Sequence, residues 1–158
     1  DLPESTVQLD KDTLVDGLRY MTLTVTPNRT VHQMRMYTAI ETPLQHISWN
    51  GVAVKADSTE TLYKKRGSKG ILSYYRGKND KLEFKFAVPK GVNPKFTLKE
   101  FSYDLLENPK FTVSARPNTT MPKPFVPNDA IIVERTIDIS EYAFAKAKND
   151  TINTGVEE

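Results

Sequence analysis

"KLEFKFAV", residues 81–88, alternates apolar and charged side chains without a break over its first six positions. Successive side chains of an extended strand point to opposite faces, so this alternation separates two sets of residues. The apolar set is Leu82, Phe84, Phe86 and Val88, and the opposite set is Lys81, Glu83 and Lys85. The stretch therefore predicts a β-strand with one buried face and one solvent face.

The same period of two recurs on both sides of this strand. It is found in "LRYMTLTVTP" (18–27) and in "VHQMRMYTAI" (31–40), where the predicted core-facing sets are Arg19, Met21, Leu23 and Val25, and Met34, Met36 and Ile40. In "KFTLKEFSYDLL" (95–106), Phe96, Leu98 and Glu100 share a face, and the pattern changes at Phe101. We expect a β-bulge at that change.

Turn signals separate the strands. Asn50-Gly51 in "HISWNGVAVKA" lies between apolar runs and predicts a type I′ hairpin, because both residues tolerate positive φ. Glycine and proline punctuate the remainder at intervals of about ten residues. The fold predicted is all-β: an antiparallel β-sandwich with Ig-like packing and about eight or nine strands.

One domain accounts for most of the chain. Residues 1–140 are predicted to form the β-sandwich, and residues 141–158 a short helix or tail. Helical character is confined to "SEYAFAKAKND" (140–150), with Ser140 as the expected N-cap.

The stretch "RPNTTMPKPFVPND" (116–129) is rich in proline and admits three interpretations: a linker, a PxxP ligand, or an ordered part of the domain. The strong strand pattern "AIIVERTIDI" (130–139) follows at once. Its apolar residues must join the same core, so we expect an ordered crossover that carries the chain over the sandwich to its last strand.

Charge and composition exclude several classes of function. The 158 residues contain 22 Lys and Arg against 20 Asp and Glu, a net charge of +2, which gives no basic surface for nucleic acid. The absence of cysteine excludes disulfides and thiolate metal sites. No apolar run approaches the roughly 20 residues of a membrane span, so we expect no span in this chain.

The sequence offers few candidate catalytic or metal-binding residues. His32 and His46 have no second ligand at metal-binding spacing, and Ser68 lacks the context of a nucleophile. We therefore expect no enzymatic activity, no metal and no cofactor in this chain. The basic segment "YKKRGSKG" (63–70) is interpreted as a solvated loop or as an interaction surface, through Lys64, Lys65, Arg66 and Lys69.

Aromatic residues raise a carbohydrate-binding alternative. Trp49, Tyr74 and Tyr75 could stack on a sugar ring if they formed an exposed row. Adjacent strand residues point to opposite faces, so only one of the two tyrosines could take part, and core packing is the competing interpretation.

A resemblance to a known family runs over residues 5–140. "DGLRYMTLTVTPNRTVHQMRM", "ISWNGVAV", "SYYRG", "FSYDL", Arg116-Pro117, Met121-Pro122 and "IIVERTIDI" occur in an order that resembles the β-sandwich following the catalytic domain in some bacterial zinc aminopeptidases of metallopeptidase family 28. The similarity is greatest to members related to the endoplasmic reticulum metallopeptidase. Asp104 stands where that family usually has glycine.

The resemblance implies a non-catalytic accessory domain. Zinc and the catalytic residues of such a hydrolase would lie in an upstream peptidase domain of the same polypeptide, which is the implied partner. The implied location is extracytoplasmic, in the periplasm or at the cell surface. A carbohydrate-binding or adhesion module remains the alternative.

The resemblance also implies a structural role for six residues. Arg116, Pro117, Met121 and Pro122 would hold the proline-rich stretch beside the strand that contains Glu100 and ends at Tyr103. Arg116 is expected to pair with Glu100. The loops around Met121 and Lys64, together with Tyr74 and Tyr75, are the expected interaction surface.

Overall fold

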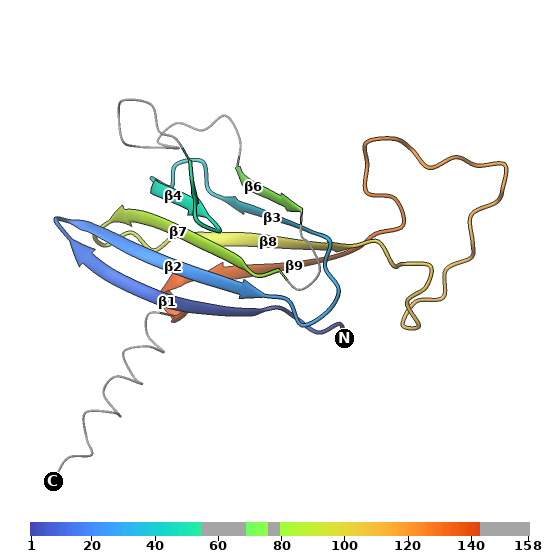
Figure 1. The fold of residues 1–158 in the computed structure, drawn as a ribbon, viewed down its shortest axis with the longest axis horizontal. Coiled ribbons are helices and arrows are strands. Elements are labelled where there is room, and N and C mark those ends of the chain that lie inside the picture. The colour runs from blue at the N-terminus through green and yellow to red at the C-terminus, as the bar shows by residue number, and fades with distance from the viewer. Residues whose placement is uncertain (55–68, 76–79, 143–158) are drawn as a thin grey trace, which may run out of the picture.

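The computed structural model describes residues 1–54, 69–75 and 80–142, and it is an all-β sandwich (Figure 1). The nine strands are β1 (Thr6–Val15), β2 (Leu18–Thr26), β3 (Gln33–Thr38), β4 (Gln45–Trp49), β5 (Val52–Ala53), β6 (Gly70–Tyr75), β7 (Leu82–Pro89), β8 (Lys95–Ser102) and β9 (Ile131–Asp138). They form a five-stranded sheet in the order β1-β2-β7-β4-β5 and a four-stranded sheet in the order β6-β3-β8-β9. Every pairing is antiparallel.

This strand order gives the predicted Ig-like packing. Strands β1, β2, β7 and β4 occupy the positions of strands A, B, E and D of a constant-type immunoglobulin sheet, and β3, β8 and β9 occupy those of C, F and G. Strands β5 and β6, both within the connection from β4 to β7, extend the two sheets at their edges. Residues 103–130 therefore take the place of the F–G loop.

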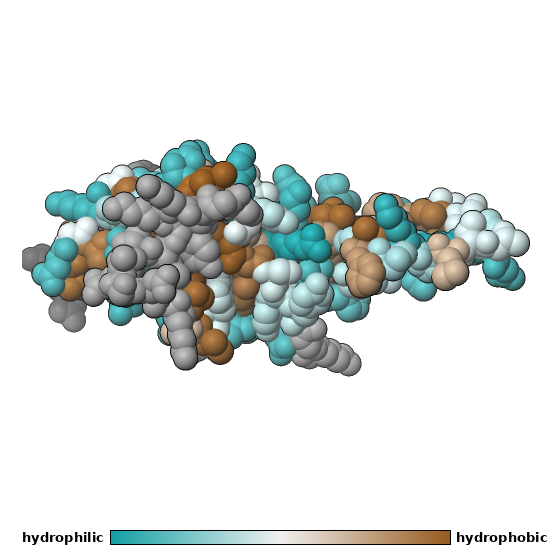
Figure 2. Space-filling view, turned by 90° about the horizontal axis from the view of Figure 1, so that it is seen from above, coloured by the Kyte–Doolittle hydropathy of each residue, from teal (hydrophilic) through white to brown (hydrophobic). Residues whose placement is uncertain are grey.

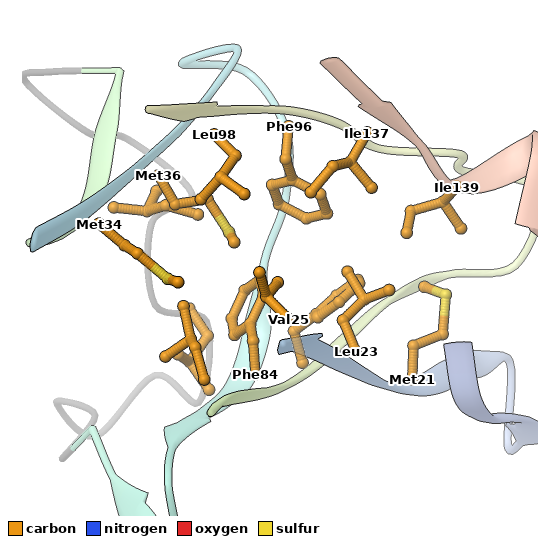
Figure 3. Close-up of a cluster of buried hydrophobic side chains, with 14 of the residues drawn as sticks. Met21, Leu23, Val25, Met34, Met36, Phe84, Phe96, Leu98, Ile137 and Ile139 are labelled. Carbon is orange, nitrogen blue, oxygen red and sulfur yellow. The ribbon is translucent and has the colours of Figure 1, made fainter. Parts of the chain in front are cut away.

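The core lies between the two sheets and is built from the alternating sets. The predicted inward residues of β2 and β7 are buried, with the exception of Arg19, which is partly exposed and pairs with Asp12 of β1. The buried ones are Met21, Leu23, Val25, Leu82, Phe84, Phe86 and Val88. Met34, Met36, Phe96, Leu98 and Ile137 face them from the other sheet (Figure 3). Phe96 contacts Phe84 and Phe86 edge to face at centroid distances of 5.5 Å and 5.2 Å. Ile40, expected to share this face, lies beyond the end of β3 and is exposed.

The bulge predicted at Phe101 is wrong. The register of β8 with β3 and β9 is unbroken from Phe96 to Phe101. Glu100 stays on the inner face, and Phe101 is buried on the outer face beneath the Arg35 guanidinium, 4.8 Å from its ring centroid. The change from polar to apolar therefore marks a covered position on the outer face. The register shifts lie elsewhere: between β3 and β6 at Met36/Tyr37 in this sheet, and in the other sheet in β1 between Leu9 and Lys11 and in β4 between Gln45 and Ser48.

The tight turn between β4 and β5 follows the prediction. Asn50 and Gly51 have φ values of 45° and 80°, the left-handed region that a type I′ turn requires. The Asn50 side chain also accepts a hydrogen bond of 2.7 Å from the backbone N–H of Glu83 in β7. This contact joins the hairpin to the sheet.

A helical turn begins directly after β9, at Ile139, and continues through Tyr142. Its N-cap is Asp138, not Ser140 as expected. The Asp138 carboxylate accepts hydrogen bonds from the backbone N–H and the hydroxyl of Ser140, at 3.0 Å and 2.6 Å. The predicted remainder of this helix, after residue 142, and the tail lie outside the described residues.

The proline-rich stretch is not a crossover. Strands β8 and β9 are direct neighbours, so the connection between them does not need to pass over the sandwich. Figure 1 shows residues 103–130 leaving the end of β8, extending away from both sheets and returning to the start of β9. The stretch belongs to a long projecting loop, which we call the F–G loop.

Candidate interaction site at one end of the sandwich

Three segments meet at the end of the sandwich from which the F–G loop projects. They are residues 1–5 before β1, residues 27–32 between β2 and β3, and residues 103–130. The Asn28 amide donates to the backbone oxygen of Glu4 at 2.7 Å, and the His32 backbone N–H donates to the carbonyl of Phe101 at 2.8 Å. Residues 27–32 are thus attached both to the segment before β1 and to the end of β8, from which the loop leaves.

A buried polar network closes this end of the core. Glu100 and Ser102 lie on the inner face of β8 and have no exposed surface. Glu100 accepts a hydrogen bond from the Ser5 hydroxyl through Oε1. Arg29 donates to Ser102 Oγ at 2.7 Å and to the carbonyl of Glu100 at 3.3 Å. The network therefore connects residues 1–5 and residues 27–32 with the end of β8, from which the F–G loop leaves.

The network extends to Asp104, the second residue of the loop. A hydrogen bond from Ser102 lowers the pKa of the Asp104 carboxyl, and the Asn108 amide and the Arg29 charge act in the same direction. Among the described residues, Arg29 Nε, Glu100 Oε2 and Asp104 Oδ1 are buried polar atoms with no hydrogen-bond partner. These three atoms belong to one connected group of residues. The unsatisfied buried polar atoms of the described residues are therefore concentrated at the loop base.

Tyr103 secures the loop on its outer side. Its backbone N–H donates to His32 Nδ1 at 3.2 Å, and the two rings lie 5.4 Å apart. Its hydroxyl lies 3.2 Å from Gln33 Oε1, and the Gln33 amide donates to Ser73 Oγ at 2.8 Å. His32 thus has a structural role at the start of the loop.

The first part of the loop is a turn organised by Asp104. Its carbonyl accepts from the backbone N–H groups of Glu107 and Asn108, at 3.2 Å and 2.8 Å. The two arms of the loop are joined by a hydrogen bond of 3.3 Å from the Leu105 N–H to the Asp129 carbonyl. Backbone contacts therefore close the base.

Arg116 holds the middle of the loop, but not through the predicted partner. Its Nη2 donates to both carboxylate oxygens of Asp129 at 2.6 Å. Glu100, the expected partner, is inside the sandwich and bound to Ser5. Arg116 therefore pairs with another residue of the proline-rich stretch, and the expected pairing with Glu100 is wrong because Glu100 faces the core rather than the loop.

The part of the loop directly before Asp129 is a small closed turn. The Asn128 side chain accepts from the Lys123 N–H at 3.2 Å and donates to the Lys123 and Val126 carbonyls at 2.6 Å and 3.0 Å. Phe125 lies inside this turn with a φ of 60° and a relative exposure of 104%. We call residues 123–128 the anchor turn.

Apolar side chains on the loop are exposed to solvent. Met121 is 91% exposed, and Pro117 and Pro122 beside it are also exposed. Figure 2 shows hydrophobic residues distributed along the projecting part of the molecule. Others on the loop with at least a third of their surface exposed are Tyr103, Leu106, Phe111, Val113 and Val126. Soluble domains leave single apolar residues exposed, but a series of them on one projection indicates a contact surface.

The other predicted contact residues that the structure describes are not part of this site. Lys64, Lys65 and Arg66 lie outside the described residues. Lys69 is exposed and lies just before β6. In β6, Tyr74 packs against the core and Tyr75 is 71% exposed.

The aromatic row that a sugar platform needs is not assembled. Trp49 belongs to the sheet opposite the two tyrosines, and its ring stacks on Phe84 at 4.1 Å. Core packing is therefore the correct interpretation for Trp49 and Tyr74.

Sequence reasoning missed Phe125, Asn128, Asp129 and Arg29. "PFVPND" contained a usable signal, because Asn and Asp after proline favour turns in which their side chains bond to nearby backbone. No sequence pattern indicated Arg29, which reaches the network from a different connection.

No cluster of three or more metal-ligating side chains occurs among the residues that the structure describes. None of the helical segments in that part of the chain is long and apolar enough to span a membrane. Protein-family models, curated proteins and solved structures give no match to this chain.

Proposed function

We propose that this chain is a non-catalytic β-sandwich module that binds a protein partner through its F–G loop. The observation that carries the proposal is the anchor turn, where a phenylalanine is held completely in solvent by hydrogen bonds to its flanking backbone. The Phe125 ring buries none of its surface against the rest of the chain. The polar attachments at the loop base keep the projection in place.

The energetic argument favours an apolar contact. Burying a Phe or Met side chain is worth about 1.5–3 kcal/mol, so Phe125 and Met121 together offer on the order of 3–6 kcal/mol to a partner. Aromatic anchors of this kind dominate many protein interfaces. By fold-level analogy alone, the B–C and F–G connections are the positions from which antibody variable domains bind.

The partner we propose is another domain of the same polypeptide. This follows from the resemblance to metallopeptidase family 28, in which the sandwich accompanies a zinc peptidase domain outside the cytoplasm. Within one chain the effective concentration is high, so a modest interface centred on two apolar residues suffices. The role of the contact would be to stabilise the peptidase domain or to shape access to it.

The test uses a photoreactive benzophenone analogue of phenylalanine at position 125 in the full-length parent protein. We expect irradiation to join position 125 to a second domain of the same polypeptide, identified by peptide mass spectrometry. The matched control carries the analogue at Leu14, which is 51% exposed at the opposite end of β1. Crosslinks only to lipid, only to other proteins, or equally from both positions would contradict the proposal.

Affinity gives the quantitative check. With the second domain expressed separately, Phe125→Ala should weaken binding about 30-fold, the equivalent of a 2 kcal/mol interface anchor. Leu14→Ala should leave the affinity unchanged in the same calorimetric titration.

A further inference from the structure

We propose that Asn128 is the positioning residue of this site and that it pre-organises Phe125 for a preformed apolar pocket on a folded protein. The inference rests on the proposed function and adds both the residue that shapes the site and the kind of surface that it fits. It depends on the geometry of the anchor turn.

Asn128 uses every polar atom of its side chain within the turn. Its oxygen accepts from the Lys123 N–H, and its nitrogen donates to two carbonyls, those of Lys123 and Val126. The amide therefore pairs with Lys123 as a neighbouring strand would and fixes both ends of a short segment. All of these contacts are local, so they serve the turn and not the sandwich.

The conformation fixed in this way is one that a free chain avoids. Phe125 has a φ of 60° and Asp129 a φ of 52°. A bulky residue with positive φ is a genuine outlier, and such conformations persist only where surrounding contacts enforce them. Asn128 supplies those contacts on one side, and the bidentate pair of Arg116 with Asp129 supplies them on the other.

A fixed turn conformation raises the binding affinity only if the partner surface also has a fixed shape. Holding a side chain in its bound conformation raises affinity because less freedom is lost on binding, and this benefit requires a complementary pocket. A fluid bilayer offers no such shape. Lys123 is also the only charged residue between Arg116 and Asp129, too little for attraction to an anionic membrane. The geometry therefore fits a protein pocket that accepts one aromatic ring, with a carboxylate near its rim for Lys123.

The first experiment measures the turn in the free protein by ¹⁵N relaxation. In the wild type, the Phe125 and Lys123 amides should have order parameters of about 0.8, and Asn128→Ala should reduce them below about 0.6. Asn118→Ala, in the same loop but not among the contacts of the anchor turn, is the matched control and should change neither value. Equal order in the wild type and Asn128→Ala would overturn the positioning role without reference to any partner.

The second experiment measures binding to the separately expressed second domain of the parent protein. If the bound conformation becomes one of many, the apparent affinity of Asn128→Ala should fall about tenfold through the reduced competent population. Asn128→Asp keeps the acceptor for Lys123 and should recover part of the loss. Reduced order with unchanged affinity would overturn this inference and leave the proposed function intact.

Two further outcomes separate the inference from the proposed function. If the wild-type chain does not bind that domain at all, the proposed function fails, while the relaxation data still decide whether Asn128 fixes the turn. If the chain binds vesicles of phosphatidylcholine and phosphatidylserine and Phe125→Ala abolishes this binding, the protein pocket is wrong and the loop is a membrane anchor.

Discussion

Ser102 is a small residue on which two charged groups depend. It lies at the end of β8 with no exposed surface, accepts from Arg29 at 2.7 Å and hydrogen-bonds to Asp104. Arg29 and Asp104 already contain buried atoms without partners among the described residues. Removing one more contact therefore adds to an existing deficit.

Ser102→Ala should destabilise the fold by about 1–3 kcal/mol, the cost of leaving buried polar groups unsatisfied. The pKa of Asp104 should also rise towards its ordinary value, because the hydrogen bond that lowers it most is lost. Urea denaturation and ¹³C titration of the carboxyl group measure the two effects.

Ser73→Ala is the matched control, since it removes a serine hydroxyl that accepts from Gln33 at an exposed position. We expect it to cost about 1 kcal/mol or less and to leave the Asp104 titration unchanged. If the two substitutions changed the free energy of unfolding and the Asp104 titration equally, the network at the loop base would contribute no more to stability than an exposed hydrogen bond does.

At the scale of elements, Asp138 joins three of them. It ends β9, forms an ion pair of 2.7 Å with Lys95 at the start of β8, and caps the helical turn through Ser140. The Lys95 ammonium and then the Ser140 hydroxyl lower the pKa of Asp138 from 3.8 to about 2. The charged carboxylate therefore favours the folded state.

This shift predicts a specific dependence of stability on pH. Because the folded pKa lies below the unfolded one, the contribution of Asp138 is complete above about pH 4 and is lost as the pH falls through about 2. The stability advantage of the wild type over Asp138→Asn should shrink across this window in urea denaturation. A difference that is constant from pH 5 to pH 2 would contradict the assigned cause, and Lys95→Gln should raise the pKa of Asp138 only part of the way.

Strand positions could be predicted from the sequence because burial on one face imposes a period of two, as in β2 and β7. The strand predictions failed at two kinds of position. One is an apolar residue on the outer face that another side chain covers, and the other is a polar residue that faces inward. Phe101 was mistaken for a bulge because Arg35, from another strand, covers it. The register shift at Asp10 gave no sequence signal, since Asp10 lies in a run of three charged residues that shows no apolar alternation.

The candidate interaction site was harder to predict than the strands. Arg116 was expected to pair with Glu100, but its partner depended on which face Glu100 occupies. The three-dimensional path of the loop decides whether Arg116 pairs with Asp129 or with Glu100. The spacing of these residues in the sequence does not reveal that path.

For the whole molecule, the F–G loop is an insertion between two strands that are already neighbours. Its ends are close, as the hydrogen bond between Leu105 and Asp129 shows. The buried core residues come from the sheets, from Val31 and Leu44 in short connections and from Ile139, and none comes from the loop. The sandwich should therefore fold without most of it.

Replacing residues 106–127 by a short Gly-Ser-Gly turn tests this independence. Shortening the loop to about a third should gain roughly 1 kcal/mol of closure entropy. Loss of the partly exposed pair of Arg116 with Asp129 should cost up to about 1 kcal/mol. The two effects nearly cancel, so the melting temperature in calorimetry should change by less than about 5 °C. Failure of this variant to fold would assign the loop a structural role instead.

The irregularity in β1 has a consequence for how copies of this protein behave in a crowded solution. A long edge strand is a template on which another chain can deposit its own strand, the first step towards fibres. In β1 the ladder is interrupted at Asp10, and three consecutive charged residues, Asp10, Lys11 and Asp12, follow the outer edge there. An incoming strand would find its register broken and would have to strip water from charged groups. The long edge strand β1 is therefore a poor template for aggregation.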